Sequence, residues 1–106
     1  MDDRIIAEMT KIIADTVHPR RIILFGSRAK NTASPSSDYD FLIISDNLPP
    51  NDRYRTMARL WRTLSDFKVP KDFLIYNTTE IERWRRSKNH VIARALNEGK
   101  VVYERP

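Results

Sequence analysis

The chain has 106 residues, a hydrophobic fraction of 41% and a net charge of +5, which suits one basic domain over residues 1–106 with an anionic partner. It contains no cysteine and two histidines, which excludes disulfides, thiol catalysis and metal sites built from cysteine or histidine clusters. No apolar stretch approaches the ~20 residues of a membrane span, and the first residues do not resemble a signal peptide, so the expected location is the cytoplasm.

The first half of the chain is expected to alternate between helix and strand. An apolar spacing predicts a helix that ends at His18-Pro19, because proline disfavours helix in the residue before it. The run Arg21–Phe25 is predicted to be a buried strand, and a short helix is expected over Ser27–Lys30, before a turn-rich loop. The run Tyr39–Ser45 is predicted to be a second buried strand. The first helix should bury Ile5, Ile6, Met9, Ile12 and Ile13.

A second helix is expected after a cap at Asn51 or Asp52. Its apolar spacing predicts one inner face, and its remaining surface is basic. The residues assigned to the inner face are Tyr54, Met57, Ala58, Trp61 and Leu64, and those assigned to the basic face are Arg53, Arg55, Arg59 and Arg62.

The last third should contain a strand over Asp72–Tyr76, a helical segment opened by a capping box over Thr79–Glu82, and a strand over Val101–Tyr103. The polar stretch 85–89 is expected to kink or split the helical segment, and Gly99 to follow its end. The inside of this segment is assigned to Ile81, Trp84, Val91, Ile92 and Leu96. The order of elements predicts an α/β (α+β) protein, with a mixed sheet of about four strands flanked by helices.

The acidic residues near the predicted strand starts are candidate metal ligands. Asp38 and Asp40 are two residues apart, so their side chains should share one face of a strand and repel each other unless a cation lies between them. Asp72 begins the third strand, and if the second and third strands are neighbours, all three carboxylates meet. Oxygen ligands suit Mg²⁺ or Mn²⁺, and three carboxylates can bridge two such ions.

Gly26 and Ser27 are candidate phosphate-binding residues. Glycine lets the backbone approach a phosphate, serine supplies a hydroxyl, and the following amides can face the anion. Each feature has an ordinary alternative, because Gly-Ser after a strand is usually a turn and an Asp-x-Asp pair often caps a loop. Their order and strand context favour a nucleotide site.

The run "GSRAKNTASPSSDYDFLI" resembles the signature of the nucleotidyltransferase superfamily with a DNA polymerase β-like palm. With "KDFLIY" and "RALNEGKVVYE", nearly the whole chain is similar to minimal nucleotidyltransferases (MNT). The resemblance implies the palm-like fold, with Asp38, Asp40 and Asp72 as metal ligands and Asp72 also as proton acceptor. It implies that Gly26 and Ser27 bind the triphosphate and that Arg28 lies close to it. Asn31 stands where many relatives have glycine.

For function, the resemblance implies transfer of AMP from ATP to a hydroxyl, with release of pyrophosphate. The expected partner is a HEPN-domain toxin, silenced by adenylylation of a tyrosine. The alternative is a non-catalytic antitoxin that neutralises its partner by occlusion. Direct nucleic-acid binding is not expected, since no aromatic-plus-basic repeat is apparent. Exposed sheet edges are consistent with a homo- or hetero-oligomer.

Overall fold

The computed structural model describes residues 3–30, 32–34, 36–46, 48–88 and 90–106, so Asn31 lies outside the described residues. No helix in these ranges is both long and apolar enough to span a membrane. The elements, in chain order, are α1 (Asp3–Val17), β1 (Arg21–Phe25), β2 (Tyr39–Ser45), the 3-10 helix η1 (Pro50–Asp52), α2 (Arg53–Thr63), β3 (Lys71–Asn77), α3 (Thr78–Trp84), α4 (Val91–Glu98) and β4 (Lys100–Glu104).

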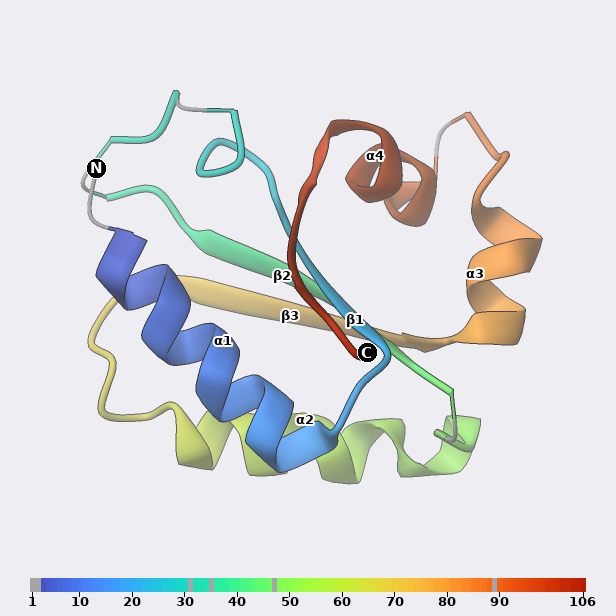
Figure 1. The fold of residues 1–106 in the computed structure, drawn as a ribbon, viewed down its shortest axis with the longest axis horizontal. Coiled ribbons are helices and arrows are strands. Elements are labelled where there is room, and N and C mark those ends of the chain that lie inside the picture. The colour runs from blue at the N-terminus through green and yellow to red at the C-terminus, as the bar shows by residue number, and fades with distance from the viewer. Residues whose placement is uncertain (1–2, 31, 35, 47, 89) are drawn as a thin grey trace.

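The four strands form one mixed sheet in the order β3-β2-β1-β4 (Figure 1). β1 is antiparallel to both β2 and β4, whereas β2 and β3 are parallel. The predicted mixed sheet is therefore confirmed, and so is the condition that the second and third strands are neighbours. In the register, Asp40 lies between Phe25 on β1 and Asp72 on β3.

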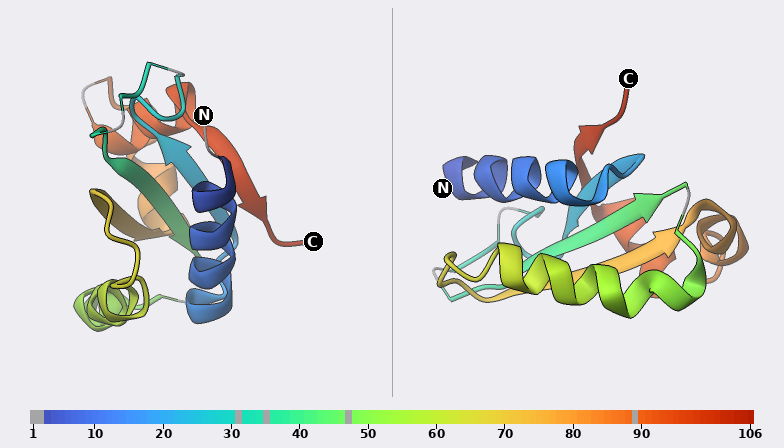
Figure 2. Two further views of the ribbon diagram at one scale, coloured as in Figure 1. Left: turned by 90° about the vertical axis from the view of Figure 1, so that its left-hand side faces the viewer. Right: turned by 90° about the horizontal axis from the view of Figure 1, so that it is seen from below.

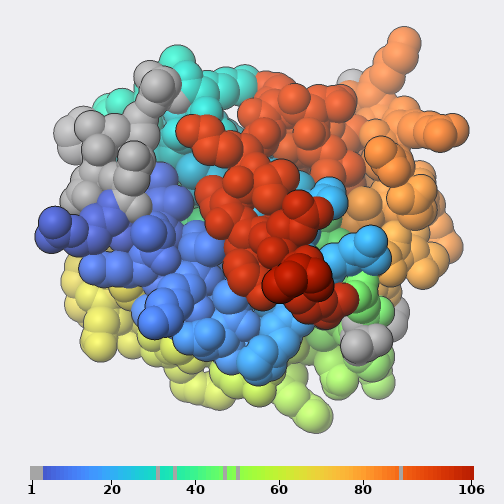
Figure 3. Space-filling model, viewed as in Figure 1, coloured from blue at the N-terminus to red at the C-terminus, as the bar shows by residue number. Residues whose placement is uncertain are grey.

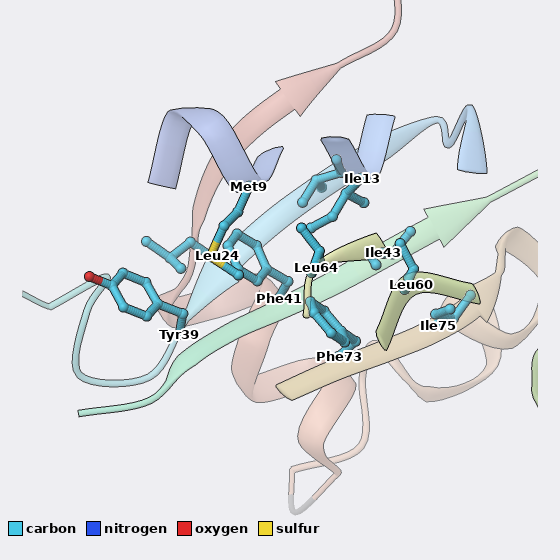
Figure 4. Packing of buried hydrophobic residues seen from close by; sticks show 11 residues of the cluster. Met9, Ile13, Leu24, Tyr39, Phe41, Ile43, Leu60, Leu64, Phe73 and Ile75 are labelled. Atoms are coloured by element: carbon cyan, nitrogen blue, oxygen red, sulfur yellow. The ribbon is translucent and has the colours of Figure 1, made fainter. Parts of the chain in front are cut away.

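Helices cover both faces of the sheet (Figure 2). The helices α1 and α2 lie on one face, where Met9, Ile13, Leu60 and Leu64 are fully buried (Figure 4). The strands supply alternate residues to this core, including Phe41 and Phe73, whose rings stack with centroids 6.1 Å apart. Full burial of one such side chain contributes about 1.5–3 kcal/mol, so this core is a main source of stability.

The opposite face of the sheet carries a smaller core under α3 and α4. Its buried residues are Ile23, Leu42, Ile44, Ile81, Ile92 and Ala95. The predicted split of the last helical segment is confirmed, because α3 ends at Trp84 and α4 begins at Val91. Side chains of even-numbered residues on β2 face this core. The side chain of Asp40 therefore lies on the same face of the sheet as α3 and α4.

The predicted inner face of α2 is confirmed at Met57 and Leu64, which pack in the core, and is wrong at Tyr54, Ala58 and Trp61. Tyr54 is 86% exposed and Trp61 is 40% exposed, whereas the helix buries Thr56 and Leu60. The reason is an anchor at the first residue of the helix: Arg53 donates from Nε to the Ile75 carbonyl oxygen at 2.9 Å and pairs with a carboxylate of α3. This contact turns the aromatic side chains outward. The assignment of Trp84 to the inside is also wrong, since it is 38% exposed.

Two local predictions differ from the structure, and a third is confirmed in position but for a different reason. Residues 27–30 form a turn instead of a short helix. The capping box lies at Asn77 and Glu80, two residues before the predicted position, because the Asn77 side chain accepts from the Glu80 amide at 2.8 Å. Gly99 follows α4 as predicted, but its φ of −82° is ordinary. It is a glycine because an added Cβ would lie 2.3 Å from the Ala95 carbonyl oxygen.

Candidate active site

Asp40 is the centre of the candidate site. It is partly buried on β2 and lies on the face of the sheet that α3 and α4 cover. Burial raises the pKa of the Asp40 carboxyl, and the negative charges of Asp38 and Asp72 raise it further. The three predicted acids are therefore close enough for their charges to interact, as the pairing of β2 with β3 requires.

Asp38 and Asp72 differ from Asp40 in being exposed. The Asp72 carboxylate accepts a hydrogen bond from the Phe73 amide at 2.9 Å, which orients it at the start of β3. Within the described residues, no three acidic or histidine side chains already converge to form a metal site. The three carboxylates nevertheless offer oxygen ligands, and their negative charges repel one another. A hard divalent cation would relieve this repulsion.

Gly26 follows the end of β1 and lies against the Asp40 carboxylate. Its φ of +77° lies in the region that side chains rarely adopt, and an added Cβ would lie 2.7 Å from Asp40 Oδ2. Glycine is thus required both by the backbone conformation and by the close approach of Asp40. The sequence-based reason for this glycine was access to a phosphate; the structure adds the contact with the acid.

Ser27 starts a compact turn beside Gly26. The Ser27 carbonyl oxygen accepts from the Lys30 amide at 3.2 Å and from the Thr32 amide at 3.1 Å. This turn and α4 enclose an open cavity of about 410 Å³. The cavity is lined by Phe25, Gly26, Ser27, Lys30, Thr32, Asp40, Val91, Arg94 and Glu98.

This cavity is also lined by two cationic side chains that were not predicted from the sequence to be site residues. Lys30 forms an ion pair with Glu98, and Arg94 lies one helical turn before Glu98 on α4. The hydrogen bond from Lys30 lowers the pKa of Glu98, with a smaller contribution from the charge of Arg94. Lys30 follows Gly-Ser closely enough to be a candidate from sequence. Arg94 and Glu98 carry no such signal, because only the packing of α4 brings them to the cavity.

Arg28 points away from this cavity. Its guanidinium donates to the Ser37 carbonyl oxygen at 2.9 Å and lies 4.0 Å from the centre of the Tyr39 ring. It lines a separate cavity of about 560 Å³ on the side of α1 and β4, two elements that lie together on the outer surface (Figure 3). The structure thus brings Gly26, Ser27 and Asp40 together and places Arg28 elsewhere.

Comparisons with known proteins identify the fold and the family. A comparison with curated protein sequences gives no significant match. Among solved structures, a toxin–antitoxin crystallised with AMP-PNP matches with a TM-score of 0.59 at 20% identity, covering 93% of this chain and 73% of that chain. A mutant of the toxin–antitoxin MntA-HpeT matches with a TM-score of 0.58 at 19% identity, covering 92% and 71%. These matches show the fold.

The family model described as polymerase beta nucleotidyltransferase matches residues 7–106. This match contains every predicted site residue and all four strands of the sheet. The resemblance noted in the sequence is confirmed: the chain belongs to the polymerase beta nucleotidyltransferase family.

Proposed function

We propose that this protein is a metal-dependent adenylyltransferase that acts as an antitoxin, transferring AMP from ATP to a tyrosine of a HEPN-type toxin in the cytoplasm. The observation that carries the proposal is the contact between Gly26 and Asp40 beside two further carboxylates. A phosphate-binding turn and a candidate metal ligand are thereby held at one cavity. Family membership supports nucleotidyl transfer, and the two complexes with similar folds support a toxin as partner.

The carboxylates fit a divalent cation. Asp40 lies close to two like charges, and Asp38 and Asp72 are exposed, so a cation can reach all three carboxylates from solvent. We expect Asp38, Asp40 and Asp72 to hold two Mg²⁺ ions, or Mn²⁺ in their place. When bound, such ions neutralise charge on the phosphates and on the departing pyrophosphate.

The cavity wall fits a triphosphate. Gly26 and Ser27 present the backbone of a tight turn, and Lys30 and Arg94 supply positive charge on two sides of the opening. Lys30 is paired with Glu98, so a bound triphosphate would compete with this carboxylate for the ammonium group. Arg28 contributes nothing to this wall, and we assign it to the support of Tyr39.

The reaction replaces the α,β-phosphoanhydride bond of ATP with a phosphodiester bond to the acceptor. The acceptor oxygen forms a bond to the α-phosphorus of ATP, and the bond from that phosphorus to the β-phosphate oxygen breaks to release pyrophosphate. The acceptor proton passes to Asp72, which is exposed and oriented by the Phe73 amide. An exposed base suits an acceptor as large as a protein, because its hydroxyl approaches from solvent.

A non-catalytic antitoxin remains the second candidate. The observation that favours it is the pair of exposed aromatic side chains, Tyr54 and Trp61, which suits a docking surface independent of the carboxylates. Occlusion would need this surface and would not need the acids. The two functions therefore respond differently to loss of the carboxylates.

The test is the intact mass of the HEPN-type protein encoded next to this chain, after incubation with the chain, ATP and Mg²⁺. We expect a mass gain of one or more AMP units, absent with Asp38→Asn/Asp40→Asn. The matched control is Asp15→Asn/Asp66→Asn, which changes two exposed carboxylates outside the active-site cavity and should transfer AMP normally. A stable complex without any mass gain would establish occlusion instead.

A further inference from the structure

The exposed side of α2 carries two neighbouring stripes of different chemistry. Because residues three, four and seven apart share one side of a helix, each stripe is continuous along the surface. The aromatic stripe consists of Tyr54, Ala58 and Trp61, and the arginine stripe consists of Arg55, Arg59 and Arg62.

The exposed area of the aromatic stripe is not explained by folding. Tyr54 is 86% exposed, and among the described residues it takes part in no ring contact or hydrogen bond. Trp61 is held in place, with its ring edge on Phe73 at a centroid distance of 5.1 Å and Lys71 Nζ at 5.4 Å. A rigid, half-exposed tryptophan loses little side-chain entropy on binding, which is the property of an interface anchor.

The arginine stripe carries uncompensated charge. None of its three members forms an ion pair with a described carboxylate, whereas Arg53 at the start of the same helix is paired with Glu80. The helix Arg53–Thr63 contains four arginines and no acidic residue. Asp46 and Asp52 line one cavity with Arg55 and Arg59, but Asp46 is already paired with Arg20 and Arg105, so positive charge is in excess beside the apolar anchors.

We infer that this side of α2 is the docking surface for the acidic face of a protein partner, with Tyr54, Ala58 and Trp61 inserting into an apolar groove. Anchors at i, i+4 and i+7 are the pattern of a helix that binds in a groove, and Tyr, Trp and Arg are the residue types that dominate binding energy at interfaces. The inference rests on the proposed function, because the partner it names is the toxin.

Two other occupants fit less well. A second copy of this chain would place one arginine stripe against another about a two-fold axis, and like charges in contact oppose association. Single-stranded nucleic acid binds in a positively charged groove with aromatic platforms along it. The two aromatic side chains of α2 lie on a convex helix, and neither of them lines the cavity at Asp40 or the one between α1 and β4.

The position of α2 connects this surface to the active site. α2 packs against β3, an edge strand of the sheet (Figure 1). Trp61 touches Lys71 and Phe73, the two neighbours of Asp72 in the chain. A partner seated on α2 would lie beside the open edge of β3, and its acceptor hydroxyl would reach Asp72 around that edge, because Asp72 alternates with Phe73 and faces the side of the sheet under α3 and α4.

The experiment measures the affinity of the purified HEPN-type partner for the wild type and for two matched charge reversals. Arg55→Glu/Arg59→Glu/Arg62→Glu should weaken binding about 100-fold, because attraction becomes repulsion. Arg83→Glu/Arg85→Glu/Arg86→Glu makes the same change of charge at exposed positions in the last turn of α3 and just after it, and should change affinity less than about threefold. Tyr54→Ala, which leaves the core untouched, should weaken binding about tenfold.

Equal effects of the two reversals, or an α2 variant that binds like the wild type, would overturn the inference. Loss of binding to a labelled single-stranded RNA of about 12 nucleotides, with partner affinity retained, would assign the surface to nucleic acid and also overturn it. AMP transfer is measured in the same samples. If AMP is transferred but the α2 variants bind the partner like the wild type, the docking surface is refuted and the proposed catalysis stands. If binding depends on α2 but no AMP is transferred, catalysis is refuted and the docking surface stands.

Discussion

At the scale of single residues, Asp40 is held in the site at a cost to stability. Its carboxyl is partly buried, it faces two like charges, and it approaches the backbone of Gly26 so closely that any side chain there would collide with it. A raised pKa in the folded state means that the charged form is less favourable after folding than before. Ionised Asp40 therefore destabilises the fold.

We predict that Asp40→Asn is more stable than the wild type at pH 7.5 and therefore has a higher Tm. Because the pKa of Asp40 is raised from its usual 3.8, the advantage should be complete above the folded pKa and shrink as pH falls through it toward 3.8. Urea unfolding between pH 4 and 8 measures this, with the exposed Asp15→Asn as control. A variant less stable than the wild type at pH 7.5 would contradict the electrostatic account.

At the scale of elements, the sequence predicted strands better than helix faces. The strands Arg21–Phe25 and Tyr39–Ser45 were predicted at their observed bounds, because buried β-branched runs are unambiguous between turn residues. The rotation of α2 was missed because its buried side includes Thr56, and because the contact of Arg53 with Ile75 joins elements far apart in sequence. An apolar pattern cannot distinguish a core stripe from an exposed one of the same period.

The capping box of α3 allows a direct test at this scale. The structure places the cap at Asn77, which accepts from the Glu80 amide, while the Glu80 carboxylate accepts from the Asn77 amide at 2.9 Å. Asn77→Ala should lower the free energy of unfolding by about 1 kcal/mol, or roughly 4–8 °C in Tm. Thr79→Ala, at the position where the sequence predicted the cap, should change it by less than about 0.5 kcal/mol. Thermal unfolding with the reverse ranking would show that the cap lies at Thr79.

For the whole molecule, the part of the site that lies on the strands could be predicted from the sequence. Parallel pairing of β2 with β3 brings Asp72 beside Asp40, and both residues were identified from strand starts. The wall from α4 was not predictable, since it depends on how closely Gly99 packs against Ile23 on β1. The orientation of the Arg28 side chain was likewise not predictable, because it depends on a tertiary contact with the Tyr39 ring that the sequence motif does not specify.

As a whole, the folded molecule should bind Mg²⁺ in the absence of nucleotide. A cation that binds only the folded state stabilises it by RT ln(1 + [L]/Kd), which is about 1.4 kcal/mol at ten times Kd. We expect Mg²⁺ at constant ionic strength to raise the Tm of the wild type and of Asp15→Asn/Asp66→Asn, but not that of Asp38→Asn/Asp40→Asn. Constant ionic strength matters because a chain of net charge +5 responds to salt through its whole surface. An equal rise in Tm for all three proteins would show that the ion binds elsewhere. The premise that a metal relieves the repulsion among these carboxylates would then be wrong.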